Sequence, residues 1–303
     1  MTVRILTGDV RKTLLLLPDD SVDCVVTSPP YWLQRDYGHP DQLGMEPTVQ
    51  EYVAAQTSVF REVRRILKPT GTAWINIGDA YAANAGGSQG SSGGRFGRKI
   101  VHKRTMSRIS GGLKRKDLSM VPNRLAISLQ DDGWYVRSEI IWAKTSPVPE
   151  SAQDRPTRSH EKIWLLTKSE SYWYDGCAVR EDSGANLRDV WRISAQPSNI
   201  PHVALMPPDL VERCIRLGCP EGGRVLDPFG GAGTTGLVAE RIGRNATLIE
   251  VSPRFSMLAH GRIADDAPAL FPANISHRAL YFGGDSFYNH GHALSIKVKR
   301  GRI

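Results

Sequence analysis

Ser28 heads a Ser-Pro-Pro-Tyr-Trp sequence that directly follows an apolar segment. Pro29 and Pro30 fix φ and lack N–H groups, so the backbone here presents carbonyl oxygens, to which Ser28 adds a hydroxyl. Tyr31 and Trp32 contribute aromatic faces. Acceptors beside a ring suit the exocyclic amino group of a planar base. The alternative is a rigid turn whose aromatic side chains only cover the core.

A second set of chemically informative residues follows another apolar segment near the other end of the chain. Asp227 precedes a Gly-x-Gly-x-x-Gly motif formed by Gly231, Gly233 and Gly236, and Glu250 lies 19 positions beyond the first of these glycines. This arrangement is typical of a backbone turn that approaches a nucleotide-like ligand while a carboxylate holds its ribose hydroxyls. Taken alone, the motif also fits a glycine turn that packing requires.

The charge of Asp227 discriminates between nucleotide ligands. A dinucleotide such as NAD would bring its pyrophosphate close to this carboxylate, and like charges at that distance repel each other. S-adenosylmethionine carries an ammonium and a sulfonium group and no phosphate, so Asp227 can attract its amino-acid end while Glu250 holds its ribose. We therefore expect S-adenosylmethionine as the cofactor.

Alternating strand and helix patterns flank both motifs. The strands are expected at residues 3–6, 22–26, 72–77, 134–142, 224–226 and 246–249, and residues 163–167 form a further apolar segment. The helices are expected at residues 9–17, 48–67, after 122, and at 209–217 and 234–242. Thr48 and Glu51 have the spacing of a capping box at the start of the second helix. The alternation predicts an α/β fold with a mostly parallel, doubly wound sheet, whose strand carboxyl ends would bring the two motifs together.

Composition narrows the class of protein. The 303 residues include 39 Lys and Arg against 31 Asp and Glu, a formal net charge of +8, and 40% are hydrophobic, as in soluble globular proteins. No apolar segment of about 18 residues could span a bilayer, and the N-terminus lacks the features of a signal peptide. The four cysteines form no Cys-x-x-Cys pair. We therefore expect a cytoplasmic protein with neither a membrane association nor a metal site.

The excess positive charge is concentrated in residues 84–119. This segment holds eight of the 29 glycines and nine basic side chains against one acid, Asp117. Such a segment predicts contact with a polyanion such as duplex DNA, although a solvated loop without a partner would have the same composition. The candidate DNA-binding residues are Arg95, Arg98, Lys99, Lys103, Arg104, Arg108, Lys114, Arg115 and Lys116.

The two motifs resemble those of a known family. Ser28-Pro-Pro-Tyr, followed late in the chain by Asp227-Pro-Phe-Gly-Gly-Ala-Gly-Thr-Thr, is similar to the motifs of amino-directed DNA methyltransferases of the β group. The resemblance covers most of residues 4–262. It implies a Rossmann-like S-adenosylmethionine methyltransferase fold in circularly permuted order, with the catalytic half first. Serine at the head of the motif is typical of cytosine-N4 enzymes, whereas Asp or Asn is usual in adenine-N6 enzymes, so the resemblance implies cytosine N4.

The resemblance also implies roles for individual residues. The target base would be flipped out of the duplex and stacked on Tyr31, with its amino group donating to Ser28 Oγ and the Pro29 carbonyl during direct methyl transfer. The implied catalytic residues are Ser28, Pro29, Pro30 and Tyr31. The implied cofactor-binding residues are Asp9, for the adenine amino group, and Asp227, Phe229, Gly231, Gly233, Thr234 and Glu250.

One methyltransferase domain is expected over residues 1–263. Its parts are a catalytic half at 1–83 and 120–170, the basic insertion at 84–119, a candidate target-recognition region at 171–200 and a cofactor half at 201–263, followed by a tail at 264–303 of unknown role. Residues 145–159 are a second candidate for target recognition.

Alternatives to this function stay open at the level of sequence. They are an adenine-N6 methyltransferase, an RNA methyltransferase and a non-catalytic DNA-binding protein. A prokaryotic or phage source, a cognate restriction endonuclease and a homodimer are compatible with the resemblance, but the residues do not decide them.

Overall fold

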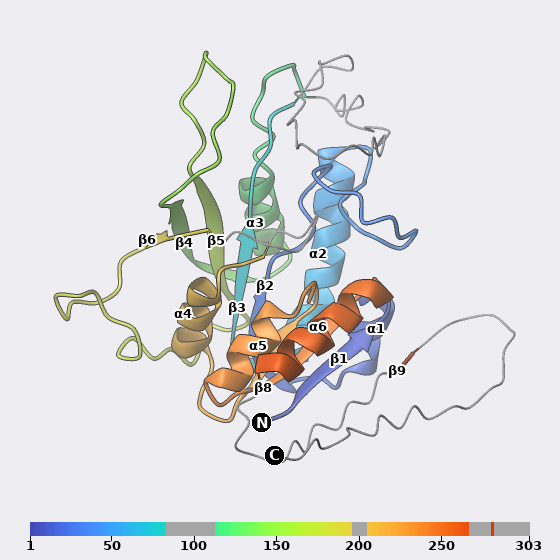
Figure 1. Cartoon of the computed structure of the whole chain (residues 1–303), viewed down its shortest axis with the longest axis vertical. Coiled ribbons are helices and arrows are strands. Elements are labelled where there is room, and N and C mark those ends of the chain that lie inside the picture. Colours follow the sequence, from blue (N-terminus) through green and yellow to red (C-terminus); the bar gives the residue numbers. More distant parts are fainter. Residues whose placement is uncertain (83–112, 196–204, 267–279, 282–303) are drawn as a thin grey trace, which may run out of the picture.

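The computed structural model arranges the chain around one twisted sheet (Figure 1). It describes residues 1–82, 113–195, 205–266 and 280–281. Within these residues the strand order is β6-β4-β5-β3-β2-β7-β8-β1-β9. The bounds are β1 Val3–Thr7, β2 Val22–Thr27, β3 Leu67–Ile77, β4 Tyr135–Lys144, β5 His160–Thr167, β6 Val190–Ile193, β7 Arg224–Asp227, β8 Asn245–Glu250 and β9 Leu280–Tyr281.

Strand direction confirms the expected mostly parallel α/β sheet, with one exception. Strand β5 is antiparallel to both of its neighbours, β3 and β4, whereas every other pair in the described sheet is parallel. Ile77 at the end of β3 therefore pairs with Lys162 near the start of β5. Because β5 is reversed, its first residues lie at the edge where the parallel strands end.

Helices cover both faces of the sheet. The helices α1 Val10–Thr13, α2 Val49–Ile66 and α3 Val121–Asp131 pack on one face, and α4 Pro208–Gly218, α5 Thr234–Arg241 and α6 Pro253–Asp266 pack on the other (Figure 1). Along β2, Val25 joins the first core, whereas Cys24 and Val26 join the second. A strand that is apolar on both faces in this way is typical of a doubly wound fold. No helix in the described part of the chain is long and apolar enough to cross a membrane.

Helix α2 shows how local sequence positions the first motif. Thr48 Oγ1 accepts a hydrogen bond from the Glu51 N–H at 3.1 Å, and Glu51 Oε2 accepts one from the Thr48 N–H at 2.9 Å, which completes the expected capping box. The helix then buries Tyr52, whose hydroxyl donates to the Pro30 carbonyl at 2.8 Å. The cap and the buried face of α2 therefore fix the backbone that follows Ser28.

The sequence does not predict β6 or α6. Residues 171–189, which lead into β6, begin at the opposite edge of the sheet from Ser28. There the Trp173 N–H donates to the Thr70 carbonyl at 2.8 Å, and the Asp175 N–H donates to the Leu217 carbonyl at 3.0 Å. The candidate target-recognition region therefore begins away from the edge that carries the two motifs, whereas β6 pairs with the end of β4 and Ala195 lines the cavity.

Candidate active site

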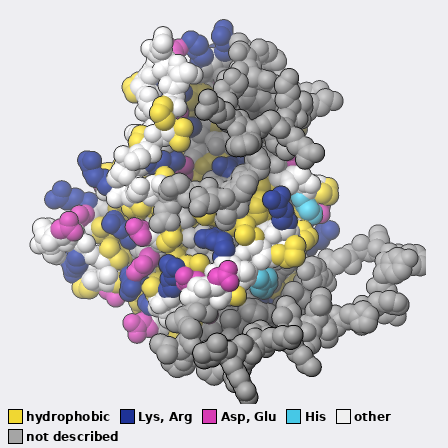
Figure 2. All heavy atoms as spheres, viewed as in Figure 1, with side chains coloured by type: hydrophobic (Ala, Val, Ile, Leu, Met, Phe, Trp, Pro, Cys, Tyr) yellow, Lys and Arg dark blue, Asp and Glu magenta, His cyan; other side chains and the backbone are white. Residues whose placement is uncertain are grey.

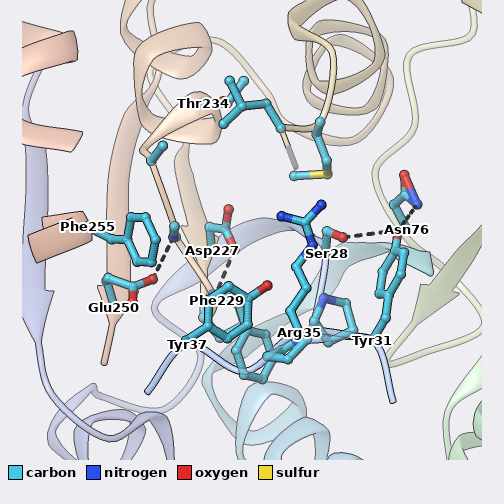
Figure 3. A pocket seen from close by; sticks show the side chains of 18 of the residues that line it. Ser28, Tyr31, Arg35, Tyr37, Asn76, Asp227, Phe229, Thr234, Glu250 and Phe255 are labelled. Carbon is cyan, nitrogen blue, oxygen red and sulfur yellow. Dashed lines mark hydrogen bonds between the residues drawn. The ribbon is translucent and has the colours of Figure 1, made fainter. Parts of the chain in front are cut away.

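The two motifs meet in one cavity of about 310 Å³ at the edge formed by the carboxyl ends of the parallel strands (Figure 3). Residues 28–31, after β2, line one part of it, and residues 227–232, after β7, line another. Strands β2 and β7 are hydrogen-bonded neighbours although about 200 residues separate them. A cavity of this volume suits a small ligand.

One wall of the cavity is a hydrogen-bonded network around Tyr31. The Tyr31 hydroxyl donates to Glu161 Oε2 at 2.6 Å, and Asn76 Nδ2 donates to Tyr31 Oη at 3.0 Å and to Glu161 Oε2 at 2.7 Å. Lys144 Nζ forms an ion pair with Glu161 Oε1 at 2.5 Å. Ser28 Oγ lies 3.4 Å from Tyr31 Oη. Side chains from three strand ends thus connect to Ser28.

Asn76 contributes an unused acceptor to this wall. Its side chain is 1% exposed, and among the described residues its Oδ1 has no hydrogen-bond partner. The orientation of the amide is chemically determined, because the Glu161 carboxylate can only accept and must face the Nδ2 group. A buried acceptor without a partner costs folding free energy, so the amide of Asn76 is held in place by the bonds that its Nδ2 group makes to Tyr31 and Glu161.

The two aromatic side chains after Ser28 lie in different places, Tyr31 at the cavity and Trp32 in the core. Tyr31 lines the cavity, and its ring lies against Gly78, where a Cβ would stand 2.7 Å from Tyr31 Cε2. Trp32 is 2% exposed, donates from Nε1 to the Glu46 carbonyl at 2.9 Å and belongs to the core. The expectation that Trp32 offers a face to a ligand is therefore wrong, because its indole covers the core.

Asp227 is a buried carboxylate held by three neutral donors. Its Oδ1 accepts from Thr27 Oγ1 at 2.7 Å and from the Phe229 N–H at 3.0 Å, and its Oδ2 accepts from Thr235 Oγ1 at 2.6 Å. Burial raises the pKa of Asp227 above its ordinary value, although these hydrogen bonds oppose the shift. Neutral donors leave the negative charge uncompensated, so the cavity wall here favours a cationic ligand.

Glu250 holds the glycine turn from the end of β8. Its Oε2 accepts from the Gly231 N–H at 2.8 Å and its Oε1 from the Ser252 N–H at 2.8 Å. Burial also raises the pKa of Glu250. Phe229 and Phe255 lie on either side of this part of the cavity (Figure 3). A carboxylate between aromatic rings suits a nucleoside, with the ribose at the carboxylate and the base against a ring.

The three motif glycines have different roles. Gly231 lines the cavity with φ at +52°. Gly233 does not line it, and instead packs against α6, where its Cβ would stand 2.8 Å from Ala259 Cβ. At Gly236 a Cβ would stand 2.9 Å from both Val3 Cγ1 and Leu248 Cδ1. Two of the glycines therefore serve packing, as the alternative interpretation of the motif proposed, and Gly231 borders the ligand cavity.

Replacing Gly233 by alanine is expected to lower the free energy of unfolding by about 2–5 kcal/mol. Its φ of +82° costs an L-residue roughly 1–2 kcal/mol, and the contact with Ala259 adds an overpacking cost of about 1–3 kcal/mol. Gly184 has φ of +81° but no atom within 4 Å of a Cβ, so Gly184→Ala isolates the backbone cost. Denaturant unfolding of both variants measures the difference, and equal losses would contradict the packing role.

Asp9 begins the helix that the sequence predicts from residue 9, and its own side chain does not line the cavity. Its neighbours Gly8 and Val10 line the cavity, whereas its own carboxylate caps α1 and pairs with Arg11 at 2.9 Å. The reason is local, because a capping side chain turns toward the first turn of its helix. Thr234, by contrast, lines the cavity as expected.

Several polar and aromatic residues of the cavity have no assigned role in the sequence interpretation, and five of them lie close to the two motifs. They are Tyr37, Asn76, Lys144, Glu161 and Phe255. Asn76, Lys144 and Phe255 follow or end parallel strands, so the rule that ligands bind at carboxyl ends could have found them. Glu161 could not be found in this way, because it lies at the beginning of a strand whose reversed direction the sequence does not reveal.

The basic candidates are only partly described. Lys114, Arg115 and Lys116 are exposed, and two of them pair with acids, Lys116 with Asp154 and Lys114 with Asp117. The other six candidates, Arg95, Arg98, Lys99, Lys103, Arg104 and Arg108, lie outside the described residues. Figure 2 shows Lys and Arg interspersed with Asp and Glu over the described part of the face in view.

Residues 145–159 connect β4 to β5 and therefore lie at the edge that carries the cavity. Arg158 donates to the Asp79 carbonyl just beyond β3, and the Arg155 guanidinium lies 3.8 Å from the centre of the Tyr81 ring. Arg155 also pairs with Glu150 at 2.6 Å. This second candidate for target recognition is thus anchored beside the cavity.

Known proteins are similar in sequence to most of this chain. A family described as DNA methylase matches residues 22–260. The chain is 43% identical over 272 residues to the Type II methyltransferase M.SmaI of Serratia marcescens, covering 86% of this chain and 90% of that one. It is 44% identical over 263 residues to the Type II methyltransferase M.Cfr9I of Citrobacter freundii, covering 84% and 86%.

Solved structures share the fold. The PvuII DNA methyltransferase, described as cytosine-N4-specific, is similar with a TM-score of 0.65 at 24% identity, covering 88% of this chain and 91% of that one. A protein of Thermus thermophilus, provisionally described as a DNA modification methylase and complexed with S-adenosyl-L-methionine, is similar with a TM-score of 0.64 at 28% identity, covering 92% and 100%.

Proposed function

Because the chain belongs to the N6/N4 DNA methylase family, it is a DNA methyltransferase, and we propose that its target is the exocyclic N4 amino group of cytosine in duplex DNA. S-adenosylmethionine is the cofactor. The observation that carries the choice of cytosine is Ser28, which stands at the cavity where adenine-N6 enzymes of this family usually have Asp or Asn.

The residues of the cavity fit the cofactor. When bound, it supplies a methyl group on a positively charged sulfur. The buried Asp227 carboxylate would hold its ammonium group, Glu250 its ribose hydroxyls, and the rings of Phe229 and Phe255 its adenine. The Gly231 N–H and the other backbone groups of the turn would complete the wall.

Acceptors on the Tyr31 side fit the amino group of the target base. Ser28 Oγ and the Pro29 carbonyl would accept its hydrogens. The Pro30 carbonyl is already taken by Tyr52. Accepting these hydrogens would keep the nitrogen lone pair directed at the methyl carbon. The nitrogen–carbon bond would then form as the carbon–sulfur bond breaks, and the extra amino proton would pass to solvent.

A covalent intermediate with the base is not part of this proposal. Cys24, on the strand that leads to Ser28, is fully buried, and burial raises the pKa of its thiol well above the ordinary value. A buried neutral thiol is a poor nucleophile. Since the amino group of a paired base is not accessible in a duplex, the target base is flipped into the cavity.

Contacts with the duplex would come from residues 113–120 and 145–159 rather than from 171–189. The first two segments border the cavity edge, whereas the third begins at the opposite edge beside Thr70 and Leu217. A flipped base enters from the edge that carries the cavity, so segments at that edge are placed to touch the flanking bases and phosphates.

The methylated nucleoside tests this proposal. The protein is incubated with S-adenosylmethionine and mixed-sequence duplex DNA, and the DNA is digested to nucleosides and analysed by mass spectrometry. We expect N4-methylcytosine, with duplex RNA of the same sequence as the control that stays unmodified. N6-methyladenine as the product would overturn the choice of cytosine while leaving the family assignment intact.

A further inference from the structure

Glu161 is the common end point of the polar network behind Ser28. Its two oxygens accept from the Tyr31 hydroxyl at 2.6 Å, Asn76 Nδ2 at 2.7 Å and Lys144 Nζ at 2.5 Å. The reversed direction of β5 brings it to the cavity edge, and its side chain is 15% exposed. This carboxylate therefore meets three donors, one of them an ammonium group.

The donors and acceptors of this network can be assigned unambiguously. The Glu161 anion has no hydrogen to give, so the Tyr31 hydroxyl must donate to it. Burial, together with Glu161, raises the pKa of Tyr31 well above its ordinary value, so this hydroxyl keeps its proton. The oxygen of Tyr31 is then left only as an acceptor, and Asn76 Nδ2 donates to it at 3.0 Å.

Ser28 is the remaining partner of the Tyr31 oxygen. At 3.4 Å the contact is weak, and in it the Ser28 hydroxyl is the donor. When the Ser28 hydrogen points at Tyr31, the lone pairs of Ser28 Oγ are left for the cavity. The opposite orientation would direct a hydrogen at the target amino group, and two donors facing each other would turn that group away from the alignment that methyl transfer requires.

We propose that Glu161 is a positioning residue that orients the hydroxyl groups of Tyr31 and Ser28, so that Ser28 meets the target amino group as an acceptor. The proposal rests on the proposed function, since it requires an amino group as the target, but it applies to cytosine and adenine alike. Lys144 supports it by pairing with the oxygen of Glu161 that Tyr31 does not use.

The Glu161→Gln variant tests the proposal. A glutamine has the same shape but carries only one acceptor oxygen, so it cannot accept from Lys144, Tyr31 and Asn76 together. We expect kcat to fall about tenfold, which corresponds to roughly one hydrogen bond, with unchanged dissociation constants for S-adenosylmethionine and for target duplex. Glu139→Gln is the matched control, because Glu139 pairs with Lys162 and does not line the cavity.

A double-mutant cycle separates positioning from a general structural role. Tyr31→Phe keeps the ring and removes the hydroxyl that links Glu161 to Ser28. We expect it to lower the single-turnover rate as much as Glu161→Gln does, and the double variant to be no slower than either. In a Ser28→Ala background neither change should have a further effect, because the acceptor that they orient is gone.

The results of these experiments distinguish a failure of the Glu161 proposal from a failure of the proposed function. An unchanged kcat in Glu161→Gln, or rate losses that multiply in the double variant, would refute the orientation of Ser28 by Glu161. Should Glu161→Gln fail to fold, Tyr31→Phe measured with and without Ser28→Ala decides the same question. If the wild-type protein methylates no base, the proposed function fails instead, and the variants are not the cause.

Discussion

Replacing Ser28 by alanine is expected to lower kcat by about 10²–10³-fold and to leave the dissociation constant of S-adenosylmethionine within about a factor of two. The hydroxyl lies on the Tyr31 side of the cavity, away from the carboxylates of Asp227 and Glu250 that would hold the cofactor (Figure 3). Its loss removes an acceptor that acts when the nitrogen lone pair is directed at the methyl carbon. The effect should therefore fall on the chemical step.

Single-turnover methyl transfer and calorimetric titration of the cofactor measure the two quantities. Ser21→Ala is the control, because Ser21 donates to the Pro18 carbonyl outside the cavity and its loss should change neither quantity. Ser28→Thr keeps a hydroxyl and should recover part of the rate. Equal losses of rate and cofactor affinity in Ser28→Ala would show that Ser28 supports the fold of the whole cavity rather than the base.

The sequence predicts the two halves of this cavity because parallel strands share an edge. Ser28 and Asp227 each follow an apolar segment, and the alternation of strands and helices brings the ends of β2 and β7 together. A common strand direction was enough for that step, and the structure adds that β2 and β7 are direct neighbours. The same rule cannot place Glu161, because a strand that runs in the reverse direction puts its beginning at the edge, and β5 has the same apolar pattern either way.

Two residues next to the cavity do not face it, and the sequence pattern alone does not reveal this. Asp9 and Trp32 both adjoin residues that line the cavity, but the carboxylate of Asp9 caps a helix and the indole of Trp32 completes the core. Whether a side chain next to a site turns into it depends on the partners within reach, which are Arg11 in the helix that Asp9 begins and the Glu46 carbonyl in the case of Trp32.

Asp227→Asn is expected to weaken the binding of S-adenosylmethionine about 10- to 100-fold, the range of a hydrogen bond to a charged group. The variant should still fold. The amide oxygen can keep the hydrogen bonds from Thr27 and Phe229, and the amide nitrogen can donate to Thr235, whose hydroxyl has the Val26 carbonyl at 3.5 Å as an alternative acceptor. Titration calorimetry at neutral pH measures the loss, and an unchanged affinity would contradict the ammonium site.

The pH dependence of binding should follow the same carboxylate. Since burial raises the pKa of Asp227, the group protonates at a higher pH than an ordinary aspartate. Cofactor affinity of the wild-type protein should therefore fall as the pH drops through this raised value, because a neutral carboxyl no longer attracts the ammonium. In Asp227→Asn this part of the pH dependence of cofactor affinity should be absent. The pH dependence that remains reports Glu250, because burial also raises the pKa of that group.

The contribution of Asp227 to the stability of the cofactor-free fold should fall as the pH rises, whereas its contribution to cofactor affinity should rise. A carboxyl whose pKa is higher in the folded than in the unfolded state contributes stability below the unfolded value and loses that contribution as the pH rises through the folded value. At neutral pH, wild-type Asp227 is therefore a net cost to the cofactor-free fold, and Asp227→Asn, which stays neutral, should raise the melting temperature there and not at acid pH. Saturating cofactor should reverse the order of the two proteins, because only the wild-type carboxylate recovers its burial cost by binding a cation. A variant that is less stable at every pH would instead make Asp227 a purely structural anchor for Thr27 and Thr235.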